Sequence, residues 1–129
     1  KETLMADTAY KIEYLDTAAG RNVIVVSWPT MPKDNSGVPW CSAEYPDKTV
    51  HVRGTFDGGT VTIEGTNELV PVNYLGLTDP QGTAISQGIA GIEAILENPL
   101  WIRPKVTGGG AACAIEVIIV ARRNRRRLG

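Results

Sequence analysis

The chain has 129 residues, of which 43% are hydrophobic and 21% charged, and its formal net charge is −1. This length fits one domain with a sizeable core, and the composition excludes a largely disordered chain. No apolar run approaches the ~20 residues that a membrane helix requires, so we expect no membrane partner. We therefore treat residues 1–129 as a single domain with an extended N-terminus and a basic C-terminal tail over residues 122–129.

Basic residues are concentrated in this tail. Without its five arginines, eight of the 13 basic residues remain against 14 acidic ones, which leaves a body of about −6. The asymmetry indicates an acidic partner, either nucleic acid or, as we favour, an acidic protein surface that can belong to a neighbouring copy. A solvated tail that only aids solubility is the alternative. The five arginines are Arg122, Arg123, Arg125, Arg126 and Arg127.

Two strand patterns precede a long loop. Residues 8–15 place Tyr10, Ile12 and Tyr14 on one face. Residues 21–28 are rich in β-branched side chains on both faces, which predicts a central strand that ends at Pro29 because proline cannot continue a ladder. The next segment, up to residue 47, has several prolines and no periodicity, and we expect an exposed contact loop there.

Alternation is clearest over residues 48–64. Val50, Val52 and Phe56 alternate with polar residues, and residues 60–64 alternate again after Asp57-Gly58-Gly59. An Asp-Gly pair between two alternating runs indicates a β-hairpin, because glycine tolerates the positive φ of such turns. The sequence therefore predicts that these two strands pair side by side.

Residues 85–97 depart from the strand pattern. Ile85, Ile89, Ile92 and Leu96 recur at helical spacing, which predicts one or two helical turns around residues 89–96. Gly88 and Gly91 weaken such a helix. We expect this short helical segment to cover an open end of the sheets.

The last third of the chain returns to strands. Residues 100–106 alternate, and their internal Pro104 indicates an edge position or a bulge. Residues 112–121 form a long β-branched strand, and a short extended piece is expected near residues 70–75. Six or seven strands with frequent turns predict an all-β fold, a β-sandwich for which a jelly roll is favoured, with one short helical segment.

No catalytic constellation emerges from the residue types. His51 is the one histidine and has no cysteine at ligand spacing, so a metal site has no support. The glycine clusters match neither a P-loop nor a dinucleotide-binding motif. Asp57 and Glu64 flank the predicted hairpin, but strand-face carboxylates are common, and Cys41 and Cys113 are expected to be free thiols. We predict a protein that is not an enzyme and has no catalytic residue, cofactor or metal.

Contact chemistry remains as the basis of function. Aromatic residues are enriched in binding hot spots. Trp40 lies in the proline-rich loop beside Tyr45 and is the candidate interface anchor, with packing of its own loop as the alternative. Trp40, Tyr45 and the five tail arginines are the candidate partner contacts.

Three segments together resemble a known family. They are VRGTFDGGTVTIEGTN (52–67), LTDPQG (77–82) and IRPKVTGG (102–109), followed by an apolar strand that ends in Arg122-Arg123. This order, over roughly residues 48–123, resembles the jelly-roll cement or decoration proteins of tailed bacteriophage capsids. The resemblance implies a structural virion protein on the capsid exterior that clamps neighbouring major capsid proteins. It also implies a small symmetric homo-oligomer, for which we favour a dimer over a trimer.

Two alternatives stay open on the same fold class. Residues 59–67 are also similar to a strand of discoidin-like carbohydrate-binding jelly rolls, where a Ser-Asn-Asp turn commonly stands in place of Thr66-Asn67-Glu68. A tail or baseplate component of the virion is the other alternative, since a fold does not determine a function.

Overall fold

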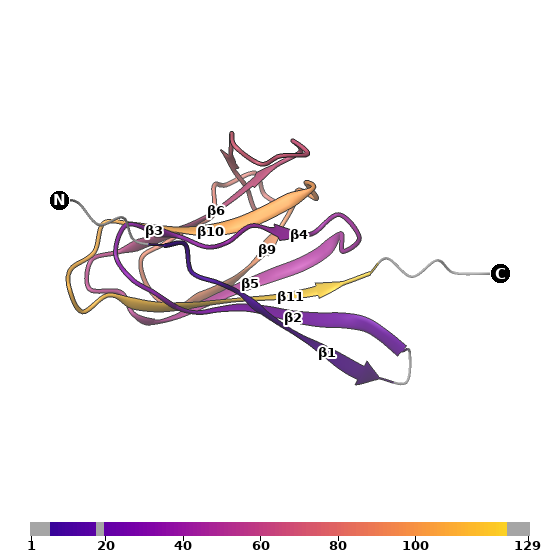
Figure 1. Ribbon diagram of the computed structural model, residues 1–129, viewed down its shortest axis with the longest axis horizontal. Helices are drawn as coiled ribbons and strands as arrows, with labels where there is room; N and C mark the ends of the chain where they lie inside the picture. Colours follow the sequence, from indigo (N-terminus) through magenta and orange to yellow (C-terminus); the bar gives the residue numbers. More distant parts are fainter. Residues whose placement is uncertain (1–5, 18–19, 124–129) are drawn as a thin grey trace.

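The computed structural model describes residues 6–17 and 20–123. They form two antiparallel sheets that pack into a β-sandwich, which confirms the predicted fold class (Figure 1). The strands are β1 (Lys11–Thr17), β2 (Gly20–Met31), β3 (Asn35–Ser36), β4 (Trp40–Cys41), β5 (Asp47–Thr55), β6 (Thr60–Thr66), β7 (Leu75–Gly76), β8 (Ser86–Gln87), β9 (Gly91–Ile95), β10 (Trp101–Thr107) and β11 (Ala114–Arg122).

The two sheets differ in their strand order. The five-stranded sheet has the order β1-β2-β11-β5-β9. In the six-stranded sheet, β3 and β4 both pair with one edge of β10, β6 pairs with its other edge, and β7 and β8 pair with β6. From β2 onward the chain passes repeatedly from one sheet to the other, with β3 and β4 in succession and β6, β7 and β8 in succession in the six-stranded sheet. β2 and β11, at the two ends of this series, lie side by side.

The core lies between the sheets and follows the period of two. Along β11, Ile115, Val117 and Ile119 are fully buried while the residues between them are partly exposed. Trp28 of β2 is also fully buried, and its Nε1 donates to the backbone oxygen of Val38 at 3.1 Å. Burial of a large aromatic ring with its polar atom satisfied makes Trp28 a major source of stability.

The predicted hairpin is wrong, although both of its strands exist. β5 pairs with β11 and β9, whereas β6 pairs with β10, β7 and β8 of the other sheet. The Asp-Gly turn therefore carries the chain from one sheet to the other. Asp57 and Gly58 have φ of 47° and 85°, and Gly54 has φ of 122° just before them. The turn chemistry is as expected, but both edges of β5 are occupied by distant strands.

The predicted helical segment is also wrong, since the described residues contain no helix. It follows that no helix in this part of the chain could span a membrane. β9 instead forms an edge of the five-stranded sheet beside β5. Ile95 faces the core and is 4% exposed, while Ile92 faces outward and is 64% exposed. Gly88 and Gly91 oppose a helix, and the free edge of β5 provides backbone partners that a short isolated helix would lack.

Two prolines lie where the ladders are interrupted. Pro104 of β10 faces the gap between β3 and β4, so its missing N–H removes no strand pairing there, and its oxygen accepts from Gly37 N at 2.9 Å. β2 continues past Pro29 to Met31, and its register with β11 shifts at this point. The predicted end of the strand at Pro29 is therefore replaced by a local irregularity.

Candidate protein-binding surface

An aromatic cleft of about 350 Å³ opens between β1 and β4. Ile12 and Tyr14 lie opposite Val26 and Ile24 of β2, so these side chains of β1 face inward. Although Tyr14 is on the inward face of β1, it is 56% exposed, because β1 is an edge strand of its sheet. The cleft is lined by Tyr10, Ile12, Tyr14, Ile24, Trp40, Cys41, Glu44, Tyr45 and Arg123.

The structure brings together three of the residues that the sequence indicates as partner contacts. Trp40, Tyr45 and Arg123 all line the aromatic cleft. The Trp40 and Tyr45 ring centroids are 5.8 Å apart, and the Arg123 guanidinium lies 5.4 Å from the Tyr45 centroid. Arg123 Nη2 also pairs with Glu44 Oε1 at 2.7 Å, so a charged pair forms the rim of an aromatic wall.

Trp40 is not the exposed anchor that its loop position suggests. It is 3% exposed, and Tyr45 is 8% exposed, because β4 pairs with β10 and turns the indole into the core. Trp40 is thus the floor of the cleft. Arg122 is exposed at the end of β11, and Arg125, Arg126 and Arg127 lie outside the described residues.

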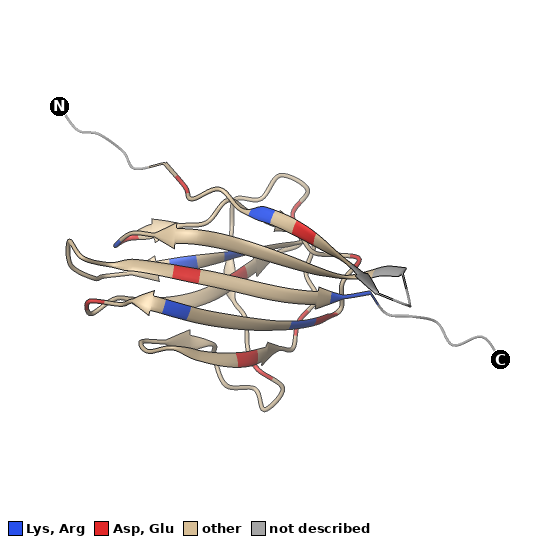
Figure 2. Ribbon diagram, turned by 90° about the horizontal axis from the view of Figure 1, so that it is seen from below, with Lys and Arg blue, Asp and Glu red and all other residues tan. Residues whose placement is uncertain are grey.

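Charges elsewhere on the described chain are scattered singly over the strands (Figure 2). Arg122 is the last residue of β11, and Arg123 follows it. Arg53 pairs with Glu116 at 2.7 Å, and Arg103 pairs with Glu64 at 3.0 Å. The Asp57 carboxylate accepts from Ala112 N at 3.0 Å and so holds the corner between the sheets. The two carboxylates weighed in the sequence analysis thus have structural partners.

A second exposed feature is the apolar loop, which we define as residues 69–75. Four of its side chains project into solvent, with Leu69 85%, Val70 76%, Val72 68% and Leu75 78% exposed. Sequence reasoning predicted a short extended piece here and missed its role as a surface. The signal in the sequence was the apolar run Leu-Val-Pro-Val, which begins three residues after the last residue of β6 and does not alternate with polar residues.

Glu68 holds the apolar loop in one conformation. Its Oε1 accepts from Val72 N at 3.0 Å and Asn73 N at 2.8 Å, and its Oε2 accepts from Asn73 Nδ2 at 2.9 Å. These hydrogen bonds, led by the Asn73 backbone N–H, lower the pKa of Glu68 from 4.5 to about 2. Behind the loop, the Arg103 guanidinium lies 3.7 Å from the centroid of the Tyr74 ring.

We predict that Glu68→Ala releases the apolar loop without unfolding the sandwich. The amides of Val72 and Asn73 lose their acceptor, so their hydrogen exchange accelerates while the amides of β11 keep their protection. Glu44→Ala is the matched control, because Glu44 is equally a surface carboxylate and has no contact with the loop. In the wild type, the order that the Glu68 carboxylate gives the loop is present above pH 4.5 and is lost as pH falls toward about 2. Unchanged exchange in Glu68→Ala would contradict this role.

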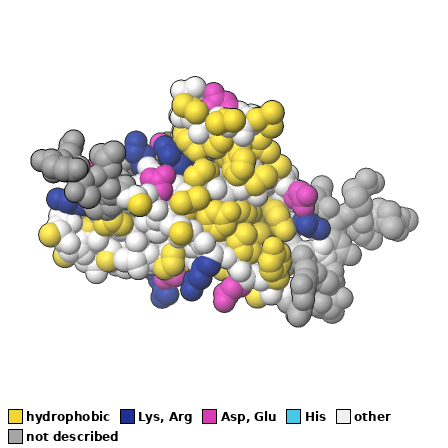
Figure 3. All heavy atoms as spheres, viewed as in Figure 1, with side chains coloured by type: hydrophobic (Ala, Val, Ile, Leu, Met, Phe, Trp, Pro, Cys, Tyr) yellow, Lys and Arg dark blue, Asp and Glu magenta, His cyan; other side chains and the backbone are white. Residues whose placement is uncertain are grey.

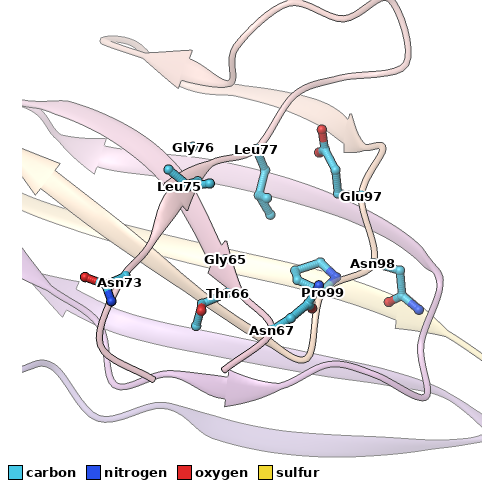
Figure 4. Close-up of a pocket in the computed structure, with 10 residues that line it drawn as sticks. All are labelled: Gly65, Thr66, Asn67, Asn73, Leu75, Gly76, Leu77, Glu97, Asn98 and Pro99. Carbon is cyan, nitrogen blue, oxygen red and sulfur yellow. The ribbon is translucent and has the colours of Figure 1, made fainter. Parts of the chain in front are cut away.

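A pocket of about 440 Å³, here the loop pocket, lies beside the apolar loop (Figure 4). Leu75 and Asn73 belong to both features. Leu77 and Pro99 are buried and give the pocket an apolar floor, and in Figure 4 the side chain of Leu77 points into the space above Pro99. Three amides line the pocket as well, namely Asn67, Asn73 and Asn98.

Hydrophobic side chains gather in a broad band on one face of the molecule (Figure 3). Soluble monomers seldom expose large contiguous apolar areas, and those that do use them as binding sites. Among the described residues, no group of three or more His, Cys, Asp or Glu side chains is placed to hold a metal ion. Cys41 and Cys113 are both free thiols, as the sequence predicts.

Comparisons of the chain with protein-family models, with curated proteins and with solved structures find no match.

Proposed function

We propose that this chain is a cement protein, a non-enzymatic structural protein that binds the outside of a phage capsid and stabilises contacts between major capsid proteins. The aromatic cleft is the observation that carries the proposal. Tyrosine, tryptophan and arginine are the residues most enriched in protein-binding hot spots, and the cleft exposes Tyr14 and Arg123 above the buried ring of Trp40. The identity of the partner rests on the sequence resemblance to capsid cement proteins.

The strand order supports a jelly roll, the fold of those cement proteins. From β2 to β11 the chain crosses repeatedly between the sheets, and the first and last strands of this series are neighbours. Such an order agrees with the two Greek keys of a jelly roll. Because jelly rolls serve many functions, the order supports the family and not the task.

The cleft suits a protruding apolar or aromatic side chain of the shell. Tyr14 offers a half-exposed ring on one wall, Trp40 closes the floor, and the Arg123–Glu44 pair provides a polar rim. A buried centre surrounded by a polar rim is the usual anatomy of a protein interface. We therefore assign the capsid contact to this cleft.

The test is co-sedimentation of the purified protein with expanded capsids that lack it, followed by thermal disruption of the particles. We expect saturable binding and a raised disruption temperature. Tyr14→Asp should weaken binding at least tenfold, since loss of a hot-spot aromatic typically costs more than about 1.4 kcal/mol. Ile92→Asp, at a similarly exposed position on β9, should bind like the wild type. Absence of binding by the wild-type protein would overturn the cement function, and full binding by Tyr14→Asp would move the contact elsewhere.

The basic tail is proposed as an auxiliary contact to an acidic protein surface. A chain truncated before Arg125 should bind capsids more weakly at low salt and converge with the full chain at high salt, because exposed charges are screened. If the truncated chain binds equally at every salt concentration, the tail has no part in binding.

The cleft also supports a second candidate function, carbohydrate binding. The half-exposed ring of Tyr14, beside the Arg123–Glu44 pair, is a surface on which a sugar ring can stack. Binding to a glycan array that is lost in Tyr14→Ala would favour this function. Trp40→Ala is a poorer test, because the buried Trp40 belongs to the core.

A further inference from the structure

The apolar loop is an exposed and ordered surface that a contact at the aromatic cleft would not cover. The two features share no lining residue, so a capsid contact in the cleft leaves the loop uncovered. Leu69, Val70 and Leu75 each expose more than three quarters of their surface, while Glu68 fixes the backbone between them. An ordered loop loses little conformational entropy when it binds, which is the property of a preorganised contact.

The loop lies directly beside a concave site of matching chemistry. The loop pocket has an apolar floor at Leu77 and Pro99, and Leu75 and Asn73 belong to both the loop and the pocket. A two-fold interface uses the same patch on both partners and therefore requires that the patch be complementary to itself. A projecting apolar segment beside an apolar pocket fulfils this requirement, because a two-fold rotation places each loop opposite the other copy's pocket.

The charges and amides of this face also fit a second copy. Outside the tail the chain carries about −6, so two copies repel each other wherever their carboxylates meet. The carboxylates at this face, Glu68 and Glu97, already accept hydrogen bonds within the chain, Glu68 from Asn73 and Glu97 from Thr78. The amides of Asn67, Asn73 and Asn98 also make hydrogen bonds within the chain. Each keeps further capacity toward a second copy, because an amide has two donor hydrogens and an oxygen that accepts two hydrogen bonds.

We propose that this protein self-associates through this face, with the apolar loop of each copy seated in the loop pocket of the other. The interface is apolar with an amide rim. It leaves the aromatic cleft of both copies free, and it does not depend on the cement function proposed above.

The test is the molar mass in solution, measured by light scattering during size-exclusion chromatography. We expect a wild-type mass of twice the 13.9 kDa of one chain. Val70→Asp should shift the apparent dissociation constant at least tenfold toward the monomer. Ile92→Asp, which adds the same charge at an exposed isoleucine outside this face, should remain associated. Val70 is exposed, so circular dichroism and thermal unfolding should show both variants folded.

The salt dependence of self-association distinguishes this interface from association through the basic tail. Contacts between tail arginines and an acidic body weaken as salt rises, whereas an uncharged apolar interface persists in high salt. A monomeric wild-type protein, or an oligomer that Val70→Asp leaves intact, would overturn the proposal. So would an oligomer that dissociates in high salt. Capsid binding is scored separately with Tyr14→Asp, so the two proposals can fail independently.

Discussion

Gly54→Ala is expected to lower the free energy of unfolding by about 4 kcal/mol. Gly54 is the penultimate residue of β5, close to the corner between the sheets, and its φ is 122°. A Cβ atom there would clash with the backbone oxygen of Ala114, which β11 holds in place. Backbone strain and overpacking each cost about 1–3 kcal/mol, and here both apply. Urea unfolding measures the change, which is a large part of the 5–15 kcal/mol typical of a domain.

Two glycine variants separate the strain from the clash. Gly58→Ala changes a residue with φ of 85° and no atom within 4 Å of the added Cβ, so it should lose only the strain, about 1–2 kcal/mol. Gly76→Ala has free space and no positive φ, and it should stay within about 0.5 kcal/mol of the wild type. Equal losses in Gly54→Ala and Gly58→Ala would mean that the corner relaxes around the new side chain.

We expect the buried amine of Lys48 to make the free energy of unfolding increase as pH rises from about 8 to 10.5. Its side chain is 1% exposed, and Nζ donates to Tyr45 O at 2.7 Å and to Asn98 Oδ1 at 2.8 Å. Burial lowers the pKa of Lys48 from 10.5 to about 8, against a smaller opposing effect of Asp47. The unfolded chain therefore binds the proton more tightly, and stability falls as pH decreases from 10.5 to about 8 and is then constant. The difference between the two pKa values corresponds to roughly 3 kcal/mol.

Comparison of the wild type with Lys48→Met isolates this effect, because other titrating groups contribute equally to both. The stability of the wild type relative to Lys48→Met should rise by roughly 3 kcal/mol between about pH 8 and pH 10.5. Val50→Ala, at a buried neutral position on the same face of β5, should lose stability by an amount that does not change over this interval. A parallel pH profile of wild type and Lys48→Met would show that the amine is hydrated in the folded protein.

Much of the local structure was predictable from the sequence because it depends on neighbouring residues. The β-branched residues of β2 predicted a central strand, and β2 does lie between β1 and β11. The turn at Asp79-Pro80 forms as its residue types indicate, with Asp79 Oδ1 accepting from Gln81 N and Thr83 N. Pro104 was expected at an edge or bulge, and it lies where one neighbouring edge is divided between β3 and β4. Each of these features has a cause within a few residues of chain.

The candidate site was only partly predictable. The sequence indicates Tyr45 and Arg123 as candidate contact residues. For Tyr14 it indicates only a position on one face of a predicted strand. Its exposure depends on β1 lying at an edge of its sheet, which no local pattern records. Trp40 lies in a loop rich in proline, which made it a candidate interface anchor with packing of its own loop as the alternative. The pairing of β4 with β10 buries it.

By itself the sequence determined the all-β class, the positions of the long strands β1, β2, β5, β6, β10 and β11, and the inward-facing side chains of those that alternate. These properties follow from backbone preferences and from the period of two, and both act over a few residues. Only the tertiary structure decided which strands pair, that residues 91–95 form an edge strand and that the apolar loop is exposed. Those outcomes depend on competition among distant segments for the same backbone partners and the same core. The alternation of β5 and β6 is compatible with a hairpin, but β11 and β9 occupy both edges of β5 and direct β6 into the opposite sheet.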